Sequence, residues 1–134
     1  MAKHISFTNI VIGVQYSRPE LAEVWGYETY HALARGVVTP REDNKIILFV
    51  TEEKQVSATA YEDSLAGDRL YWEGPNDHFA EERMLKANEK DEEIHLFHRS
   101  KHHADFIYLG RLRVVNCERF SNRPSCFTFE LLDA

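Results

Sequence analysis

The spacing of apolar residues changes near residue 36, from a helical period to a strand period. Before that point, Ser17–Glu20 has the S-x-x-E pattern of a helix capping box, with a proline in the first turn where a missing N–H costs no hydrogen bond. The next apolar residues share one helical face: Leu21, Val24 and Trp25. The pattern predicts a helix from Ser17 to Gly26 and a second, shorter helical segment around residues 29–34.

After residue 36 the apolar runs are short and alternate with polar residues, as in β-strands. Six segments have this character: Val37–Thr39, Lys45–Thr51, Ile94–Arg99, Asp105–Leu109, Leu112–Cys117 and Cys126–Leu132. A polar turn joins the first two, and another joins the third and fourth, so each of these pairs is predicted to be a hairpin. Short strands in such a series favour a barrel or sandwich with one or two helices outside it.

The chain has no internal repeat, low-complexity tract or linker-like stretch. We therefore expect one domain over residues 1–134, with a helical N-terminal part (residues 1–36) and a barrel (residues 37–134). Residues 55–88 are predicted to be the longest and least regular connection. Long ordered connections in small domains tend to carry function.

The net charge of −6 is unevenly distributed along the chain. Residues 1–93 carry ten Lys/Arg against eighteen Asp/Glu, whereas residues 94–126 carry six Lys/Arg against two acids. Because local charge decides whether phosphates are attracted, an acidic protein with one basic face can still bind DNA. The alternative is an ordinary solvated surface of mixed charge.

Targeting and redox signals are sparse. No apolar run reaches the roughly 18 residues that cross a bilayer, and the N-terminal sequence lacks the pattern of a signal peptide. The two cysteines, Cys117 and Cys126, are too few for a disulfide framework and match no metal motif. These features predict a cytoplasmic protein without a membrane partner.

Four histidines crowd the basic segment: His95, His98, His102 and His103. A zinc site needs three or four converging ligands, and no zinc motif accompanies them. We expect no metal or cofactor, and we expect these histidines on the surface beside phosphate-binding cations. No nucleophile motif is present either, and the acids of Glu52–Lys54 match a nuclease pattern only in part. A binding domain is therefore expected, although a metal-dependent nuclease built on Glu81/Glu82 or Asp63/Glu73 remains an alternative.

The segment YEDSLAGDRLYWEGPNDHF, residues 61–79, mixes aromatic rings with carboxylates. Tyr61 and the Tyr71/Trp72 pair flank a polar stretch, and Asp63 follows the first ring by two residues. Two rings can sandwich a base that has left its duplex, at about 1–3 kcal/mol of stacking per base, and a carboxylate can accept hydrogen bonds from its edge. Alternatively, Tyr61 and Trp72 are core residues at the barrel end and the acids are solvated.

Four motifs in order, KIILFVTEEK, ATAYEDSLAGDRLYWEGP, EIHLFHRSKHHADFIYLGRLRVV and SCFTFELL, resemble a domain of bacterial helicase-type and nuclease-linked restriction proteins. That domain is similar to the SRA (SET- and RING-associated) domains that read 5-methylcytosine. The resemblance begins at about residue 37 and runs to the C-terminus. It departs from the family at Trp72–Pro75, WEGP, where a W-x-S-Q pattern is expected.

The resemblance implies an α+β fold, a PUA/SRA-like mixed β-barrel of short strands with one or two flanking helices. It implies a non-enzymatic domain that flips a modified cytosine of double-stranded DNA into an aromatic pocket and works with a nuclease or helicase part of the same chain or complex. The expected pocket consists of Tyr61, Asp63, Tyr71, Trp72 and Glu73. The expected phosphate-binding face consists of Arg99, Lys101, His102, Arg111, Arg113, Arg119 and Arg123. A PUA-like module that binds RNA or a protein is a further alternative.

Overall fold

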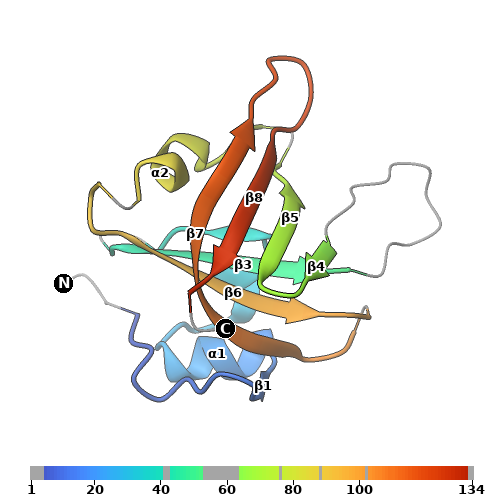
Figure 1. The fold of residues 1–134 in the computed structure, drawn as a ribbon. Coiled ribbons are helices and arrows are strands. Elements are labelled where there is room, and N and C mark those ends of the chain that lie inside the picture. The colour runs from blue at the N-terminus through green and yellow to red at the C-terminus, as the bar shows by residue number, and fades with distance from the viewer. Residues whose placement is uncertain are drawn as a thin grey trace.

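The structure is a computed structural model that describes residues 5–40, 43–52, 64–75, 77–87, 89–101 and 103–132. Its elements follow in chain order (Figure 1): β1 (Gln15–Tyr16), α1 (Arg18–Val24), the 3-10 helix η1 (Tyr30–Leu33), β2 (Val37–Val38), β3 (Lys45–Thr51), β4 (Ser64–Ala66), β5 (Arg69–Glu73), α2 (Glu81–Leu85), β6 (Glu93–Arg99), β7 (Phe106–Glu118) and β8 (Cys126–Leu131).

The two N-terminal helical segments are confirmed. Ser17 Oγ accepts a hydrogen bond from Glu20 N at 3.2 Å, and Glu20 Oε1 accepts one from Ser17 N at 3.1 Å, which completes the capping box. Gly26 follows α1 with a φ of +79°, and η1 occupies the second segment. The part expected to be helical also contributes β1, which pairs with β7. Within the described ranges, no helix combines the length and the apolar character that a membrane crossing requires.

The strands form one mixed sheet in the order β2-β3-β6-β7-β8-β5-β4. β3 and β6 are parallel, and every other pair is antiparallel. Both hairpins predicted from the sequence, β2–β3 and β6–β7, are confirmed. The parallel pair makes the sheet mixed, as expected.

The sheet curls around one apolar core. β3 and β5 are separated by three strands in the sheet order, yet both contribute to the first core cluster, which includes Leu48, Leu70, Trp72, Phe127 and Phe129. Strands far apart in a sheet can share a core only if the sheet folds back on itself, so the fold is barrel-like. A second core cluster on the other face joins α1 and η1 to β3, β6 and β7 through Leu21, Leu33, Phe49, Phe97 and Phe106.

β7 is one strand of 13 residues, where the sequence pattern predicted two strands with a break at Gly110. The break is a β-bulge: Leu96 pairs with Gly110 and Phe97 pairs with Tyr108, so Leu109 has no partner of its own. Gly110 has a φ of +104°, a conformation that side chains disfavour. The extra residue inverts the alternation, so Tyr108 belongs to the second core cluster and Leu112 to the first.

The connection predicted over residues 55–88 is more regular than expected. Residues 53–63 lie outside the described residues, but the part that follows contains β4, β5 and α2. β4 and β5 form a hairpin that turns at Gly67, with a φ of +63°, and Asp68. This hairpin replaces much of the polar loop expected between residues 61 and 71.

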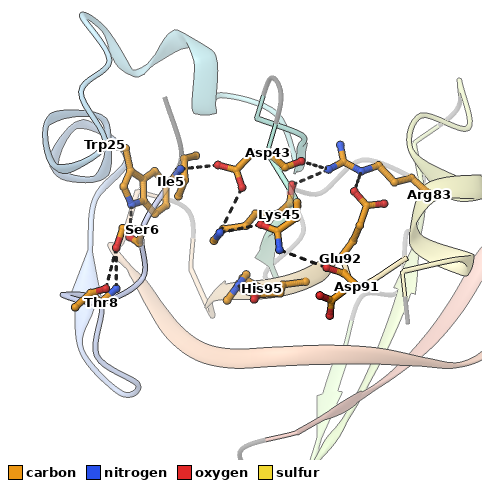
Figure 2. A network of polar contacts seen from close by, with 12 residues as sticks. Ile5, Ser6, Thr8, Trp25, Asp43, Lys45, Arg83, Asp91, Glu92 and His95 are labelled. Carbon is orange, nitrogen blue, oxygen red and sulfur yellow. Dashed lines mark hydrogen bonds and ion pairs between the residues drawn. The ribbon is translucent and has the colours of Figure 1, made fainter. Parts of the chain in front are cut away.

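A polar network fastens the N-terminal segment and α2 to the start of β3 (Figure 2). The Asp43 carboxylate is buried, accepts a hydrogen bond from Ile5 N at 2.5 Å and pairs with Lys45 Nζ at 3.3 Å. Arg83 of α2 donates to the Asp43 carbonyl oxygen at 2.6 Å and pairs with Glu92 at 2.7 Å. A buried carboxylate is tolerated when hydrogen bonds and an opposite charge satisfy it, as they do here.

Candidate nucleic-acid interface

The residues predicted to line a base pocket divide between two faces of β5. Trp72 is 6% exposed and packs against Phe127 and Phe129, with ring centroids 5.7 and 5.9 Å away. Tyr71 is 45% exposed, because neighbouring residues of a strand point to opposite faces. Tyr71 and Trp72 therefore do not line one pocket.

Of the three other members of the predicted pocket, the structure describes Glu73 alone. Glu73 is half-buried at the end of β5, and Tyr61 and Asp63 lie outside the described residues. Trp72 belongs to the first core cluster, in line with the alternative interpretation of its role. A pocket formed by Tyr61, Asp63 and one edge of Trp72 stays a prediction.

The buried carboxylate of Glu81, which was not among the predicted pocket residues, lies beside Trp72. A Cβ atom added at Gly74 would stand 3.3 Å from Glu81 Oε2 and 3.5 Å from the Trp72 ring, so both groups converge on this glycine. Glu81 is the first residue of α2 and is only 1% exposed. Residues 74 and 81 lie seven positions apart in a stretch without periodicity, so no local pattern in the sequence predicts this contact.

Three side chains satisfy the Glu81 carboxylate and form with it the Glu81 cluster. His78 Nδ1 lies 2.8 Å from Oε2, Ser125 Oγ donates to Oε1 at 2.9 Å, and Arg119 Nε lies 3.6 Å from Oε1. The backbone reinforces the same junction, since Gly74 N donates to Ser125 O at 2.9 Å. The cluster holds the connection after β5 against the β7–β8 loop. It thereby positions the segment that follows Trp72, up to Pro75.

The predicted phosphate-binding cations do not gather on one face. Arg99 lies beside Phe106 at the start of β7, whereas Arg119 and Arg123 follow its end, and 13 residues of strand span about 40 Å. Lys101 is exposed near Arg99, and Arg111 is half-buried within β7. His102 lies outside the described residues.

Two of these cations are already paired with carboxylates. Arg113 Nη2 lies 2.9 Å from Glu130 Oε1, and Arg119 Nη1 lies 2.9 Å from Glu82 Oε1. Arg123 instead stacks on Phe120, with 3.9 Å between the guanidinium carbon and the ring centre. The local excess of positive charge counted along the sequence is therefore partly neutralised in space.

The expectation of surface histidines is wrong for His95 and His98, which are both buried. His95 stacks on Phe7 with 3.7 Å between ring centres, and its nitrogens contact Tyr108 Oη at 2.7 Å and Glu93 Oε1 at 2.8 Å. Burial lowers the pKa of His95 to about 4 and outweighs the hydrogen bond to Glu93, which raises it. His95 is thus a neutral core residue and does not attract phosphates.

Glu52, which belongs to the partial match to a nuclease pattern, makes contacts that connect strands. Glu52 Oε1 accepts a hydrogen bond from Leu65 N at 2.6 Å and lies 3.3 Å from His98 Nε2, so it joins β4 to β3 and β6. In the part of the chain that the structure describes, no three His, Cys, Asp or Glu side chains converge as metal ligands.

One cation that the sequence analysis missed is Arg18, at the start of α1. Its guanidinium carbon lies 4.9 Å from the centre of the Phe106 ring, and that of Arg99 lies 4.3 Å from the same centre. The pairing of β1 with β7 brings residues 18 and 106 together. No local spacing in the sequence links these positions.

Comparison with solved structures identifies the fold. The chain is similar to the SUVH5 SRA domain in complex with hemimethylated CG DNA, with a TM-score of 0.64, 14% identity, and coverage of 96% of this chain and 93% of that chain. It is also similar to the SUVH5 SRA domain in complex with fully methylated CG DNA, with a TM-score of 0.61, 13% identity and the same two coverages. At these identities the likeness shows that the fold is SRA-like.

Sequence comparisons add the family. No curated protein matches the chain. The family model described as "Domain of unknown function (DUF3427)" matches residues 10–125, which is most of the chain. The protein therefore belongs to the DUF3427 family and has an SRA-like fold.

Proposed function

We propose that this protein binds double-stranded DNA that carries a modified cytosine and does not itself catalyse a reaction. The observation that carries the proposal is the fold: 96% of the chain superposes on SRA domains whose structures contain methylated CG DNA. We propose further that the modified base is flipped out of the duplex. We also propose that the chain acts as one domain of a modification-dependent restriction system with a nuclease or helicase part.

The proposed pocket lies at the end of β5. Tyr61, Asp63 and Glu73 are its proposed contacts, with an edge of Trp72 as a wall. The Glu81 cluster supports this location, because it lies beside Trp72 at the point where Gly74 N donates to Ser125 O, and a supported backbone helps to preorganise a binding site. Flipping costs a few kcal/mol, so a preformed wall is needed before stacking gives a preference for the modified base.

A binding titration tests the proposal. Otherwise identical duplexes carry cytosine, 5-methylcytosine, 5-hydroxymethylcytosine or N6-methyladenine at one position, and an RNA duplex of the same sequence is added as a competitor. We expect one of the two modified cytosines to bind at least tenfold more tightly than cytosine. Equal affinity for all four DNA duplexes, or preference for the RNA, would contradict the proposal.

The same samples test the nuclease alternative. Incubation of each duplex with Mg²⁺ or Mn²⁺ and the isolated chain is expected to leave the DNA intact. Metal-dependent strand cleavage that survives repurification would replace the binding function with a hydrolytic one.

A further inference from the structure

A cleft of about 320 Å³ opens between the start of α1, η1 and the turn that joins β6 to β7. Arg18, Tyr30, Arg99, Asp105 and Phe106 are among the residues that line it. Both arginines stand within 5 Å of the centre of the Phe106 ring. Arg18 also lies over Phe49, 4.7 Å from its centre.

Each of the two guanidinium groups uses only some of its N–H donors in hydrogen bonds to the protein. Arg18 Nε donates to the Leu33 carbonyl oxygen at 2.7 Å. Arg99 Nε donates to Thr51 Oγ1 at 2.7 Å, and Arg99 Nη1 donates to the Ala104 carbonyl oxygen at 3.0 Å. Among the described residues no acceptor is recorded for either Nη of Arg18 or for Nη2 of Arg99. Anchored side chains with terminal donors left over lose little freedom when an anion binds.

Among the described residues, these two arginines lack the carboxylate partner that five other arginines of the protein have. Ion pairs join Arg35 to Asp77, Arg69 and Arg113 to Glu130, Arg83 to Glu92, and Arg119 to Glu82. Within the described ranges no such pair is recorded for Arg18 or Arg99, even though Asp105 lines the same cleft. Burial lowers the pKa of Arg18, and the charge of Arg99 lowers it further. Two neighbouring, partly buried positive charges are stabilised when an anion lies between them.

We propose that Arg18 and Arg99 together bind one phosphodiester group of the DNA backbone in this cleft. The inference rests on the proposed function for the identity of the ligand and extends it with a specific contact. Guanidinium groups suit this role because their planar donors match two phosphate oxygens at once. Asp105 is exposed and lines the same cleft, so its carboxylate repels a phosphate bound there.

The salt dependence of duplex binding measures how many phosphate contacts a variant has lost. We expect the double variant R18Q/R99Q to lower the log–log slope by about 0.9, the value for one phosphate. Modified and unmodified duplexes lose affinity by the same factor, because a phosphate contact carries no information about the base. An unchanged slope would overturn the proposal, and a loss of about 1.8 would show two separate phosphates instead of a shared one.

Arg35→Gln is the matched control. Arg35 also lies over an aromatic ring, 4.4 Å from the centre of Phe79, but it pairs with Asp77. Its removal is expected to leave the slope unchanged. Asp105→Asn supplies a test in the opposite direction, since it keeps both arginines. Tighter binding of both duplexes is expected, and weaker binding together with a lower melting temperature would identify Asp105 as the true counterion.

A measurement without DNA separates this inference from the proposed function. At equal ionic strength, inorganic phosphate is expected to raise the melting temperature of the wild type above its value in chloride, and to do so less in R99Q. Equal effects on both proteins would overturn the arginine site. If R18Q does not fold, R99Q and D105N still decide the question. Failure to discriminate modified from unmodified duplex would contradict the proposed function while leaving these results unaffected.

Discussion

His95 is held in the second core cluster by contacts that suit a neutral imidazole. Nε2–H can donate to Glu93 while Nδ1 accepts from the Tyr108 hydroxyl, and the ring face covers Phe7. A histidine in a basic, histidine-rich segment looks like a surface residue in the sequence. Its burial depends on Phe7 and Tyr108, which come from two other segments, so no local pattern could reveal it.

The low pKa of His95 predicts a loss of stability in acid. The unfolded chain binds the proton near pH 6.5, whereas the folded protein binds it only near pH 4, so the unfolded state holds more protons between these values. The contribution of His95 is therefore complete above pH 6.5 and is lost as the pH falls toward 4. It amounts to about 3 kcal/mol. Urea unfolding of the wild type and of His95→Gln at pH 7.5, 6, 5 and 4 measures it, and identical pH profiles would contradict the assignment.

Trp72 and Asp63 separate folding from base recognition. Trp72→Ala removes a ring packed against two phenylalanines and is expected to cost about 3–5 kcal/mol of the free energy of unfolding. Asp63→Asn keeps the side-chain volume and is expected to leave the melting temperature near that of the wild type. It should weaken binding of the modified duplex by about 1.5–3 kcal/mol and leave the unmodified duplex nearly unaffected. Melting and both binding curves check this, and unchanged discrimination in Asp63→Asn would place the pocket elsewhere.

At the scale of elements, the bulge in β7 depends on one glycine. The φ of +104° at Gly110 lies where a side chain is strained, so Gly110→Ala is expected to destabilise the protein by about 1–3 kcal/mol. Gly36→Ala is the control, because the only atom among the described residues that an added Cβ there would meet is the Phe49 carbonyl oxygen, at an ordinary 3.7 Å. Urea unfolding of both variants measures the difference. Equal stability of the two would show that the bulge tolerates a side chain.

The elements that could be predicted are those with local signals. The capping box of α1, the hairpins β2–β3 and β6–β7, and the alternation of β8 all follow from residues close together in the sequence. The continuity of β7 could not be predicted, because a bulge interrupts the alternation in the same way as the end of a strand. β5 was missed because its segment, rich in acids, resembled a loop.

At the scale of the whole molecule, the surface available to DNA phosphates depends on where each charge lies in the folded structure and less on where it lies along the sequence. The count along residues 94–126 suggested one basic face, but β7 carries these cations from one end of the fold to the other, and α2 and β8 supply carboxylates to two of them. Arg18, which lies outside the basic segment, is brought to Arg99 by the tertiary fold. Sequence patterns therefore indicated the SRA-like fold better than the surface that would meet DNA.

This distribution predicts unequal effects of removing the cations. Arg113 and Arg69 both pair with Glu130. Arg113→Gln therefore removes one positive charge and leaves the Arg69–Glu130 ion pair in place. Arg99→Gln removes a charge that has no carboxylate partner among the described residues. We expect Arg99→Gln to weaken duplex binding at 100 mM salt several times more than Arg113→Gln does, with little change in melting temperature for Arg113→Gln because exposed ion pairs contribute little to folding. Fluorescence anisotropy titrations of one labelled duplex at several salt concentrations measure both variants side by side. A larger loss for Arg113→Gln would instead place the DNA along β7 and β8.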